Sequence, residues 1–483
     1  MTASLILDLP TEDDTARLGR ALAAILHAGD CLLLEGPIGA GKSHLARALI
    51  RARLGREEDV PSPTFTLVQT YPGTPDIWHA DLYRLTHPDE VLELGLEDAF
   101  STAICLIEWP DRLGTALPAN PLRLSLSSAG EGRRATLDFG SRPGFDHTLL
   151  RHFGAEAFID RAGWPDAGRV ALKGDASSRR YQRLIRPGQS VILMDAPPDQ
   201  ADSALDFARI DRHLRDLGLS APEILADDAT NGYLLLEDLG DDLFPAVIAK
   251  TPGLEPDLYR AATDVLLHLQ SHPAPCHLPN LLAQDWAEAA AFSIDWYRQA
   301  ILGNNDGRAD FVSALAETIT RRADGPRVLI LRDYHAENLI WLPERSGLAR
   351  VGLLDFQLAQ LGQPGYDLVS LLQDARRDVP EAIETAIIAH FAARRGDDLE
   401  TFRAAYAALG AQRALRILGI FARLCLKDGK ARYTAMIPRV WEQLRRNLRH
   451  PALKELCSVC DRLLPPPTHE NLKVLEDKCG AFR

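Results

Sequence analysis

An eight-residue segment, GPIGAGKS at Gly36–Ser43, constrains the first part of the chain more than any other feature. It matches the pattern G-x-x-x-x-G-K-[ST], follows the apolar run Cys31–Glu35 and precedes a helical pattern at Lys42–Leu54. A glycine-rich turn between a strand and a helix directs backbone N–H groups and the positive end of the helix at a phosphate group. We therefore expect a nucleotide-binding α/β domain, with four loop residues on the phosphates: Gly36, Gly39, Gly41 and Lys42.

The hydroxyl and carboxylate groups near this loop predict where a metal ion and the γ-phosphate would lie. In such loops the serine after the lysine ligates Mg²⁺, which here is Ser43. Asp81 ends an apolar-flanked segment and is expected to supply a carboxylate to the same ion, because Mg²⁺ prefers oxygen ligands. Thr64 lies where a residue that senses the γ-phosphate is expected.

Two further residues of the front part follow an apolar run. Glu108 comes directly after Ala103–Ile107, so it is expected at the carboxyl end of a strand, where it would orient the attacking water. Trp109 would stack on the base or on a partner, or pack in the core. His79 is expected to be structural rather than catalytic.

Composition limits the broad class of the protein. The chain has 483 residues and a formal net charge of −13, which suggests two to four domains and excludes a basic protein that coats nucleic acid. No stretch reaches the 18 or so apolar residues of a membrane span, no signal peptide is evident, and the 7 cysteines are scattered. These features favour a multidomain cytoplasmic protein without a membrane partner.

Four more segments of the front part, together with the glycine-rich loop, carry a family resemblance. They are SPTFTLVQTY (Ser62–Tyr71), HADLYRL (His79–Leu85), ELGL (Glu93–Leu96) and IEWP (Ile107–Pro110). In this order they resemble the TsaE family, the ATPases of the bacterial machinery that makes threonylcarbamoyladenosine on tRNA. The resemblance implies an ATPase that works with a TsaB–TsaD-type complex. Because the front part is acidic, we expect no direct grip on tRNA by this domain alone.

A turn-rich segment, GSRPGFD at Gly140–Asp146, divides the chain. We place the boundary at about 140–147, which gives domains at 1–143 and 144–483. The second domain opens with expected strands and becomes helical from Leu205 onward, interrupted by an expected strand pair at Val328–Leu331 and Val351–Leu354. The opening strands are expected at Val170–Lys173, Tyr181–Ile185 and Val191–Met194. A β-rich lobe at about 165–240 before a helical lobe at about 241–483 is typical of kinases. The expected fold is an α/β P-loop NTPase domain followed by an α+β protein-kinase-like bilobal domain.

The rear part contains the polar residues that phosphoryl transfer requires. The segment LRDYHAENLIW (Leu331–Trp341) places Asp333 five residues before Asn338, the spacing of a kinase catalytic loop. Asp333 would accept the proton of an acceptor hydroxyl, and Asn338 would hold Mg²⁺. Asp355, in LLDFQ, closes an apolar strand seventeen residues later as the second metal carboxylate.

The Arg-Asp-Tyr-His form of this loop resembles the aminoglycoside phosphotransferase family. A closer likeness, to the AmgK anomeric sugar kinases of cell-wall recycling, rests on five segments. They are GDASSRRYQRL (Gly174–Leu184), VILMDAPP (Val191–Pro198), YLLLEDLG (Tyr233–Gly240), DYHAENL and GIFARLCLKDGKARY (Gly419–Tyr433). The resemblance implies ATP, Mg²⁺ and an amino sugar, N-acetylmuramate or N-acetylglucosamine, phosphorylated at its anomeric hydroxyl.

The nucleotide contacts of the rear part are expected in two segments. In and just after GDASSRR, Ser177 could offer a hydroxyl, and Arg180 or Arg183 a cation, to the phosphates, while the backbone of an inter-lobe hinge around Glu237 would pair with adenine. Kinases carry a lysine where Met194 stands here. Its replacement stays open: Arg180, Arg183 or Lys173, or metal and backbone alone.

Two further residues and two alternative interpretations complete the sequence-based predictions. Asp367 is expected to anchor the catalytic loop from a helix N-terminus, and His335 either contacts the sugar or is packed or solvated. The acceptor could instead be another small hydroxyl compound, such as an aminoglycoside. One half could also be a non-catalytic nucleotide-binding regulator that only tethers partners.

Overall fold

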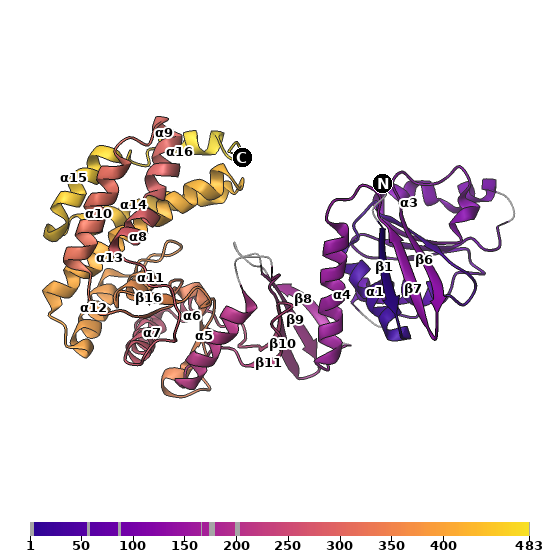
Figure 1. The fold of residues 1–483 in the computed structure, drawn as a ribbon, viewed down its shortest axis with the longest axis horizontal. Coiled ribbons are helices and arrows are strands. Elements are labelled where there is room, and N and C mark those ends of the chain that lie inside the picture. The colour runs from indigo at the N-terminus through magenta and orange to yellow at the C-terminus, as the bar shows by residue number, and fades with distance from the viewer. Residues whose placement is uncertain are drawn as a thin grey trace. The chain divides into compact units, whose positions relative to one another are not determined.

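The computed structural model describes residues 4–55, 58–85, 88–165, 167–172, 179–198 and 203–482 (Figure 1). Contacts between residues divide the chain into two compact units. The first consists of Met1–Asp195, Ala226–Asp228 and Tyr233–Leu235, and the second contains the remaining residues. The first unit thus joins the front part to the first strands of the rear part, and the domain boundary near residues 140–147 stays a prediction.

A seven-stranded sheet forms the centre of the first unit, in the order β1-β7-β6-β2-β5-β4-β3. Its strands are β1 (Ser4–Leu9), β2 (Cys31–Glu35), β3 (Val68–Tyr71), β4 (Ile77–Asp81), β5 (Ile104–Glu108), β6 (Leu122–Ala129) and β7 (Gly132–Asp138). The middle strands β6, β2, β5 and β4 pair in parallel with their neighbours in that order. Parallel pairing brings the carboxyl ends of β2, β4 and β5 to one edge, where such sheets bind ligands.

Helices cover both faces of this sheet. They are α1 (Glu12–Ile25), α2 (Lys42–Leu54) and α3 (Leu96–Thr102), with the 3₁₀ turns η1 (Pro88–Leu94) and η2 (Pro110–Leu113). Because strand side chains alternate between faces, Leu34 and Leu106 join the core shared with α1 and α2, whereas Leu33 and Ile107 join the core on the α3 side. The sheet is therefore buried on both faces, which explains the near-continuous apolar runs of β2 and β5.

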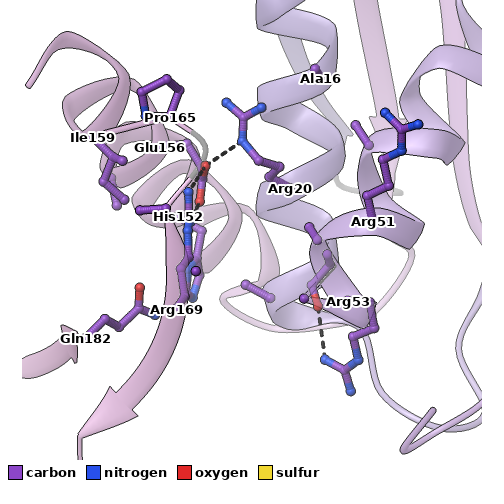
Figure 2. A pocket seen from close by; sticks show the side chains of 18 of the residues that line it. Ala16, Arg20, Arg51, Arg53, His152, Glu156, Ile159, Pro165, Arg169 and Gln182 are labelled. Atoms are coloured by element: carbon purple, nitrogen blue, oxygen red, sulfur yellow. Dashed lines mark hydrogen bonds and ion pairs between the residues drawn. The ribbon is translucent and has the colours of Figure 1, made fainter. Parts of the chain in front are cut away.

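Helix α4 (Phe145–Arg161) packs against α1 through ion pairs. Arg17 and Arg20 bind Asp160 at 2.9 and 3.0 Å, and Arg20 also binds Glu156 at 2.7 Å (Figure 2). Glu156 is buried and is held from its other side by Arg169. These contacts fix α4 on the domain that contains the phosphate-binding loop.

The other side of α4 packs on a five-stranded sheet with the order β11-β12-β10-β9-β8. Its strands are β8 (Gly168–Leu172), β9 (Arg180–Arg186), β10 (Gln189–Asp195), β11 (Ile224–Asp228) and β12 (Tyr233–Glu237). Phe158 of α4 stacks on Tyr233 with ring centroids 5.8 Å apart, in a core that includes Leu184 and Leu193. One face of this sheet is thus occupied by α4.

The second unit is mainly helical. Its helices are α5 (Ala204–Asp216), α6 (Phe244–Lys250), α7 (Glu255–Gln270), α8 (Ala283–Ala290), α9 (Gln299–Leu302), α10 (Arg308–Arg322), α11 (Tyr366–Leu372), α12 (Glu381–Arg395), α13 (Leu399–Leu426), α14 (Ile437–Leu448), α15 (Lys454–Leu463) and α16 (His469–Asp477). The 28-residue α13 is buried along most of its length and forms the centre of this bundle. Within the described ranges, the structure contains no helix with the length and hydropathy of a membrane span.

Four short strands carry the polar loops of this unit: β13 (Val328–Ile330), β14 (Leu339–Trp341), β15 (Val351–Leu353) and β16 (Gln360–Gly362). β13 pairs with β16 and β14 pairs with β15, both antiparallel. The expected pairing of Val328–Leu331 with Val351–Leu354 is therefore wrong, although both segments are strands. Each instead pairs with a strand whose residues lie 10 to 34 positions away and which the apolar pattern did not reveal, since pairing depends on register rather than on composition.

Two candidate active sites

The loop Gly36–Gly41 connects β2 to α2 as the sequence predicts. Gly36 has a φ of 133°, and a Cβ there would lie 2.4 Å from the carbonyl oxygen of Leu126, so only glycine fits. Gly39 also has a positive φ, 78°, with no atom within 4 Å of the Cβ position. Gly41 caps α2 in the left-handed conformation, and Ser43 lies in the first turn of the helix. This backbone leaves open space beside Gly39, as a phosphate-binding loop requires.

Lys42 lies across the same loop. Its Nζ donates to the carbonyl oxygens of Gly36 and Pro37 at 2.8 and 3.0 Å and lies 4.2 Å from the ring centroid of Trp109. Burial lowers the pKa of Lys42, while the carboxylates of Glu108 and Asp81 raise it. The ammonium group is therefore within the electrostatic reach of both carboxylates that the sequence assigns to this site.

Asp81 and Glu108 end adjacent parallel strands, and they pair directly in the register of β4 and β5. Both side chains are buried. The Asp81 carboxylate accepts hydrogen bonds from the Thr64 hydroxyl at 2.6 Å and from the Tyr83 backbone N–H at 3.0 Å. Four of the residues expected at this site, Lys42, Thr64, Asp81 and Glu108, thus lie together at the edge where β2, β4 and β5 end.

Two contacts of this site were not anticipated from the sequence. The Ser62 hydroxyl lies 2.8 Å from that of Thr64 and 3.4 Å from Asp81, and His79 Nε2 lies 3.0 Å from Glu108 Oε1. The alternation of the segment His-Ala-Asp was the available signal, because residues two apart in a strand share a face. It did not identify Glu108 as the neighbour, since that depends on how β4 pairs with β5.

Trp109 follows Glu108 with a φ of 60°, which turns its ring away from the strand direction. The ring lies 5.0 Å from that of Tyr83 and covers Lys42. Trp109 is partly buried and packs against the core on the α3 side, beside Lys42 and Tyr83, which agrees with the core environment among the three expected. Its stacking on a base or on a partner stays a prediction.

The second site is formed by the loop after β13. The Asn338 side-chain amide donates to the Asp333 carbonyl oxygen at 2.8 Å, which closes the five-residue loop between them. The backbone N–H of Leu354 donates to the Asn338 carbonyl oxygen at 3.0 Å, so the end of β15, where Asp355 lies, is held beside Asn338. Asp355 accepts from Gln357 Nε2 at 3.0 Å and has a φ of 57°. The structure thus brings Asp333, Asn338 and Asp355 to one loop cluster.

Asp367, in the first turn of α11, anchors the start of the loop that contains Asp333. Its carboxylate accepts from the backbone N–H groups of Leu331 and Arg332 at 2.6 and 2.9 Å, and the side chain is fully buried. Burial raises the pKa of Asp367 to about 7, although the two N–H groups oppose the rise. Arg332 has a φ of 71°, a strained conformation that these hydrogen bonds support. The expected anchoring contact is present.

His335 lies inside the same loop and is buried. Its Nε2 lies 3.3 Å from Arg376 Nη1 and 3.4 Å from Asn338 Nδ2. Burial, together with the charges of Arg376 and Arg413, lowers the pKa of His335 to about 3. The ring is therefore neutral near pH 7 and packed rather than solvated.

The nucleotide contacts expected in the rear part are only partly within the described residues. Ser177 and Lys173 lie outside them. Arg180 pairs with Asp195 across β9 and β10, its Nη2 2.8 Å from the carboxylate. Met194 faces the opposite side of the sheet, the side to which Arg183 belongs through its pairing with Ile192. Glu237 forms an ion pair with Arg345, and its N–H donates to the Glu223 carbonyl oxygen.

A cavity of about 900 Å³ lies among α1, α2, α4 and β8–β10 of the first unit, and no residue of the loop Gly36–Gly41 lines it (Figure 2). Of the residues expected to contact nucleotide or metal, Arg180 alone lines it in the part of the chain that the structure describes. Several of its arginines are already engaged: Arg20 and Arg169 bind Glu156, and Arg53 donates to the Ala23 carbonyl oxygen. These contacts indicate that the cavity is a gap between packed helices and strands rather than a nucleotide site.

The first site, a glycine-rich loop between a strand and a helix with two carboxylates on neighbouring strands, is that of a P-loop NTPase. The second, an Asp-Asn loop beside a second aspartate in a largely helical unit that follows a five-stranded sheet, is that of a protein-kinase-like phosphotransferase.

Comparison with known proteins agrees with both assignments. The family "Threonylcarbamoyl adenosine biosynthesis protein TsaE" matches residues 9–136, and the "Phosphotransferase enzyme family" matches residues 169–409. The chain is 41% identical over 350 residues to an N-acetylmuramate/N-acetylglucosamine kinase of Caulobacter vibrioides, which covers 65% of this chain and 96% of that protein. A kinase of the same name from Pseudomonas aeruginosa is 35% identical over 309 residues, 61% of this chain and 89% of that protein.

The front part has its own relatives. A tRNA threonylcarbamoyladenosine biosynthesis protein TsaE of Rickettsia bellii is 39% identical over 128 residues, which is 26% of this chain and 88% of that protein. The chain therefore belongs to the TsaE family in its front part and, in its rear part, to the family of N-acetylmuramate/N-acetylglucosamine kinases.

Proposed function

We propose that the front part hydrolyses ATP and that the rear part transfers the γ-phosphoryl group of ATP to the anomeric hydroxyl of N-acetylmuramate or N-acetylglucosamine. The observation that carries this proposal is that each part gathers its own set of phosphate-handling residues. Lys42, Asp81 and Glu108 meet at the end of a parallel sheet, and Asp333, Asn338 and Asp355 meet in one loop cluster. The choice of N-acetylmuramate or N-acetylglucosamine as acceptor rests on the names of the similar kinases.

In the front part, the loop N–H groups and Lys42 bind the β- and γ-phosphates of ATP. Thr64, held on Asp81, is placed to respond to the γ-phosphate, and Glu108 accepts a hydrogen bond from the attacking water. Trp109, which covers Lys42, excludes bulk water from that side.

In the rear part, Asp333 accepts the proton of the anomeric hydroxyl as its oxygen bonds to the γ-phosphorus. The bond from that phosphorus to the β–γ bridging oxygen breaks, and ADP leaves. Asp367 keeps the loop in place during this step, because it holds both backbone N–H groups that precede Asp333.

The donor atoms of both sites fit Mg²⁺. Ser43 and Asp81 offer a hydroxyl and a carboxylate, and Asn338 and Asp355 offer an amide oxygen and a carboxylate. A hard divalent cation prefers such oxygen ligands, and when bound it neutralises charge on the phosphates.

The front part is proposed to act with a TsaB–TsaD-type complex rather than alone. The chain is acidic overall, so the front part would supply ATP hydrolysis to a tRNA-modifying assembly without holding the tRNA itself. Dependence of both parts on ATP favours a cytoplasmic location.

Product analysis tests the rear part. The full chain with ATP and N-acetylmuramate or N-acetylglucosamine is expected to yield the sugar 1-phosphate, and Asp333→Ala to lose several orders of magnitude in rate. A panel that includes aminoglycosides separates this proposal from the alternative acceptor, because phosphorylation of an aminoglycoside but of neither amino sugar would contradict it.

Hydrolysis of ATP without a sugar tests the front part. In an Asp333→Ala background, which removes phosphoryl transfer by the rear part, ATP turnover should persist and should vanish on adding Lys42→Ala. Equal turnover with and without Lys42 would instead support the alternative of a non-catalytic tether.

A further inference from the structure

A buried histidine contacts Glu108, and the reaction proposed above gives it no role. His79 lies in β4, two residues before Asp81, and its side chain has no exposed surface. Its Nε2 lies 3.0 Å from Glu108 Oε1, and the Glu108 side chain is 3% exposed. The two residues are 29 positions apart in sequence, so this contact is a product of the fold rather than of a local turn.

The strand register explains how the contact arises. β4 and β5 pair in parallel, with His79 opposite Leu106 and Asp81 opposite Glu108. Residues two apart in a strand share a face, so all four side chains project to the side of α2, and Glu108 is the diagonal neighbour of His79. The same face holds Ile77 and Ile104, which belong to the core shared with α1 and α2. A polar ring in this apolar layer has few groups with which to bond.

Within the described residues, the ring's one hydrogen bond is to Glu108. His79 Nδ1 is buried and has no hydrogen-bond partner there. With the carboxylate as acceptor, the Nε2 atom is the donor. The bond therefore takes up one oxygen of Glu108 and restricts rotation of its carboxylate. Among the described residues, the other oxygen, Oε2, has no hydrogen-bond partner and so remains available to a further donor.

We propose that His79 is a positioning residue for ATP hydrolysis: its Nε2–H holds Oε1 of Glu108 so that Oε2 accepts the hydrogen bond of the attacking water. This rests on the ATP hydrolysis proposed for the front part. A carboxylate that rotates freely presents either oxygen in many orientations, and catalysis depends on placing such groups within a fraction of an ångström. Because His79 does not touch the nucleotide in this scheme, its loss should lower kcat and leave KM for ATP unchanged.

The test compares three substitutions at His79 in the full chain, with ATP and without sugar. His79→Leu fills the space without a donor and should lower kcat about 10- to 100-fold, the scale of a small misplacement in an active site. His79→Asn keeps an amide that is too short to reach Oε1, and it should show a similar loss if the leucine variant fails to fold. His79→Gln, whose amide can occupy the Nε2 position, should restore most of the rate.

A double-mutant cycle separates positioning from a merely structural role. If His79 acts through Glu108, then adding His79→Leu to Glu108→Gln should slow hydrolysis no further than Glu108→Gln alone. Leu106→Val, at the buried cross-strand neighbour of His79, is the matched control and should keep kcat. Urea unfolding of the same samples reports whether the front part is folded, and sugar phosphorylation reports whether the rear part is intact.

Two results would overturn this inference. One is a kcat of His79→Leu and His79→Asn equal to that of the unmodified chain, and the other is a loss that multiplies with that of Glu108→Gln. Failure of the proposed function looks different, because the unmodified chain would then hydrolyse ATP no faster than Lys42→Ala.

Discussion

Asp367→Asn tests how the catalytic loop of the rear part is held. The substitution keeps one oxygen acceptor and replaces the other with an NH₂ group. One of the two hydrogen bonds, from Leu331 N at 2.6 Å or from Arg332 N at 2.9 Å, is then lost, and a buried N–H faces a second donor. Asn therefore matches the size of Asp367 while removing the feature that anchors the loop.

The magnitude follows from those contacts. A hydrogen bond to a charged group contributes about 1.5–3 kcal/mol, and an unsatisfied buried donor costs about 1–3 kcal/mol. We therefore expect the free energy of unfolding of the rear part to fall by roughly 2–4 kcal/mol. Release of the strained Arg332, at a φ of 71°, would also move Asp333, so kcat for sugar phosphorylation should fall about 100-fold.

The assay is urea unfolding together with steady-state sugar phosphorylation at pH 8, above the pKa of about 7 that burial gives Asp367. Asp378→Asn is the matched control, since that side chain is 80% exposed and should change neither quantity by more than experimental error. A change in stability below about 0.5 kcal/mol for Asp367→Asn would refute the reasoning, because a neutral amide would then replace the carboxylate without loss.

Three further predictions concern ATP binding by the rear part, the ion pairs of Glu156 and the phosphate-binding loop. Arg183→Ala should raise the KM of the kinase for ATP about 10-fold, and Arg180→Ala should change it less, because only Arg183 shares the face of the missing lysine; equal effects would contradict this. Glu156→Ala should lower the free energy of unfolding in urea by about 1–3 kcal/mol, since it removes the buried carboxylate that pairs with Arg169 and is one of two partners of the partly exposed Arg20. Burial raises the pKa of Glu156, but Arg169 and Arg20 outweigh burial, so the pKa in the folded protein lies below the usual value. The ionised Glu156 therefore stabilises the fold above the unfolded pKa, and this stabilisation is lost as the pH falls below about 4. That pH dependence should disappear in the variant. Gly36→Ala should abolish ATP hydrolysis through the 2.4 Å clash, whereas Gly39→Ala, strained only by its φ, should unfold more easily by about 1–2 kcal/mol.

Local patterns predicted the elements next to the phosphate-binding loop well. The expected strand Cys31–Glu35 and helix Lys42–Leu54 match β2 and α2, because an apolar run and a glycine-lysine boundary are signals within a few residues. The strand β1 at Ser4–Leu9 was missed although Leu5, Leu7 and Leu9 alternate.

Contacts that depend on strand register could not be predicted in the same way. Asp333 and Asn338 lie within one loop, so their spacing alone brings them together. The contact of His79 with Glu108 and the face of Arg180 depend instead on which strands pair and in which register, and a shift of one residue would reverse both. Such information lies between segments, where composition and periodicity say nothing.

The hydrogen-bond partners of the carboxylates differ between the candidate sites and the contacts that hold the fold together. At the front site, Asp81 is held by a hydroxyl and a backbone N–H, and Glu108 by a histidine; in the rear part, Asp367 is held by two backbone N–H groups. A carboxylate whose partners are not arginines stays available to a cation, a water molecule or a strained loop.

The carboxylates that connect neighbouring helices and strands away from the two candidate sites pair with arginines instead. Glu156 and Asp195 each lie between two arginines, and Glu237 pairs with Arg345. A pair of this kind uses both charges, so recruiting either member for a nucleotide would first require the ion pair to open. We therefore expect Arg180 to stabilise the sheet and the Glu237 side chain to stabilise the contact with Arg345, so that adenine would pair with other backbone groups of the hinge around Glu237. Glu237→Gln should leave the KM for ATP within about twofold, and a larger rise would show that the ion pair opens during catalysis.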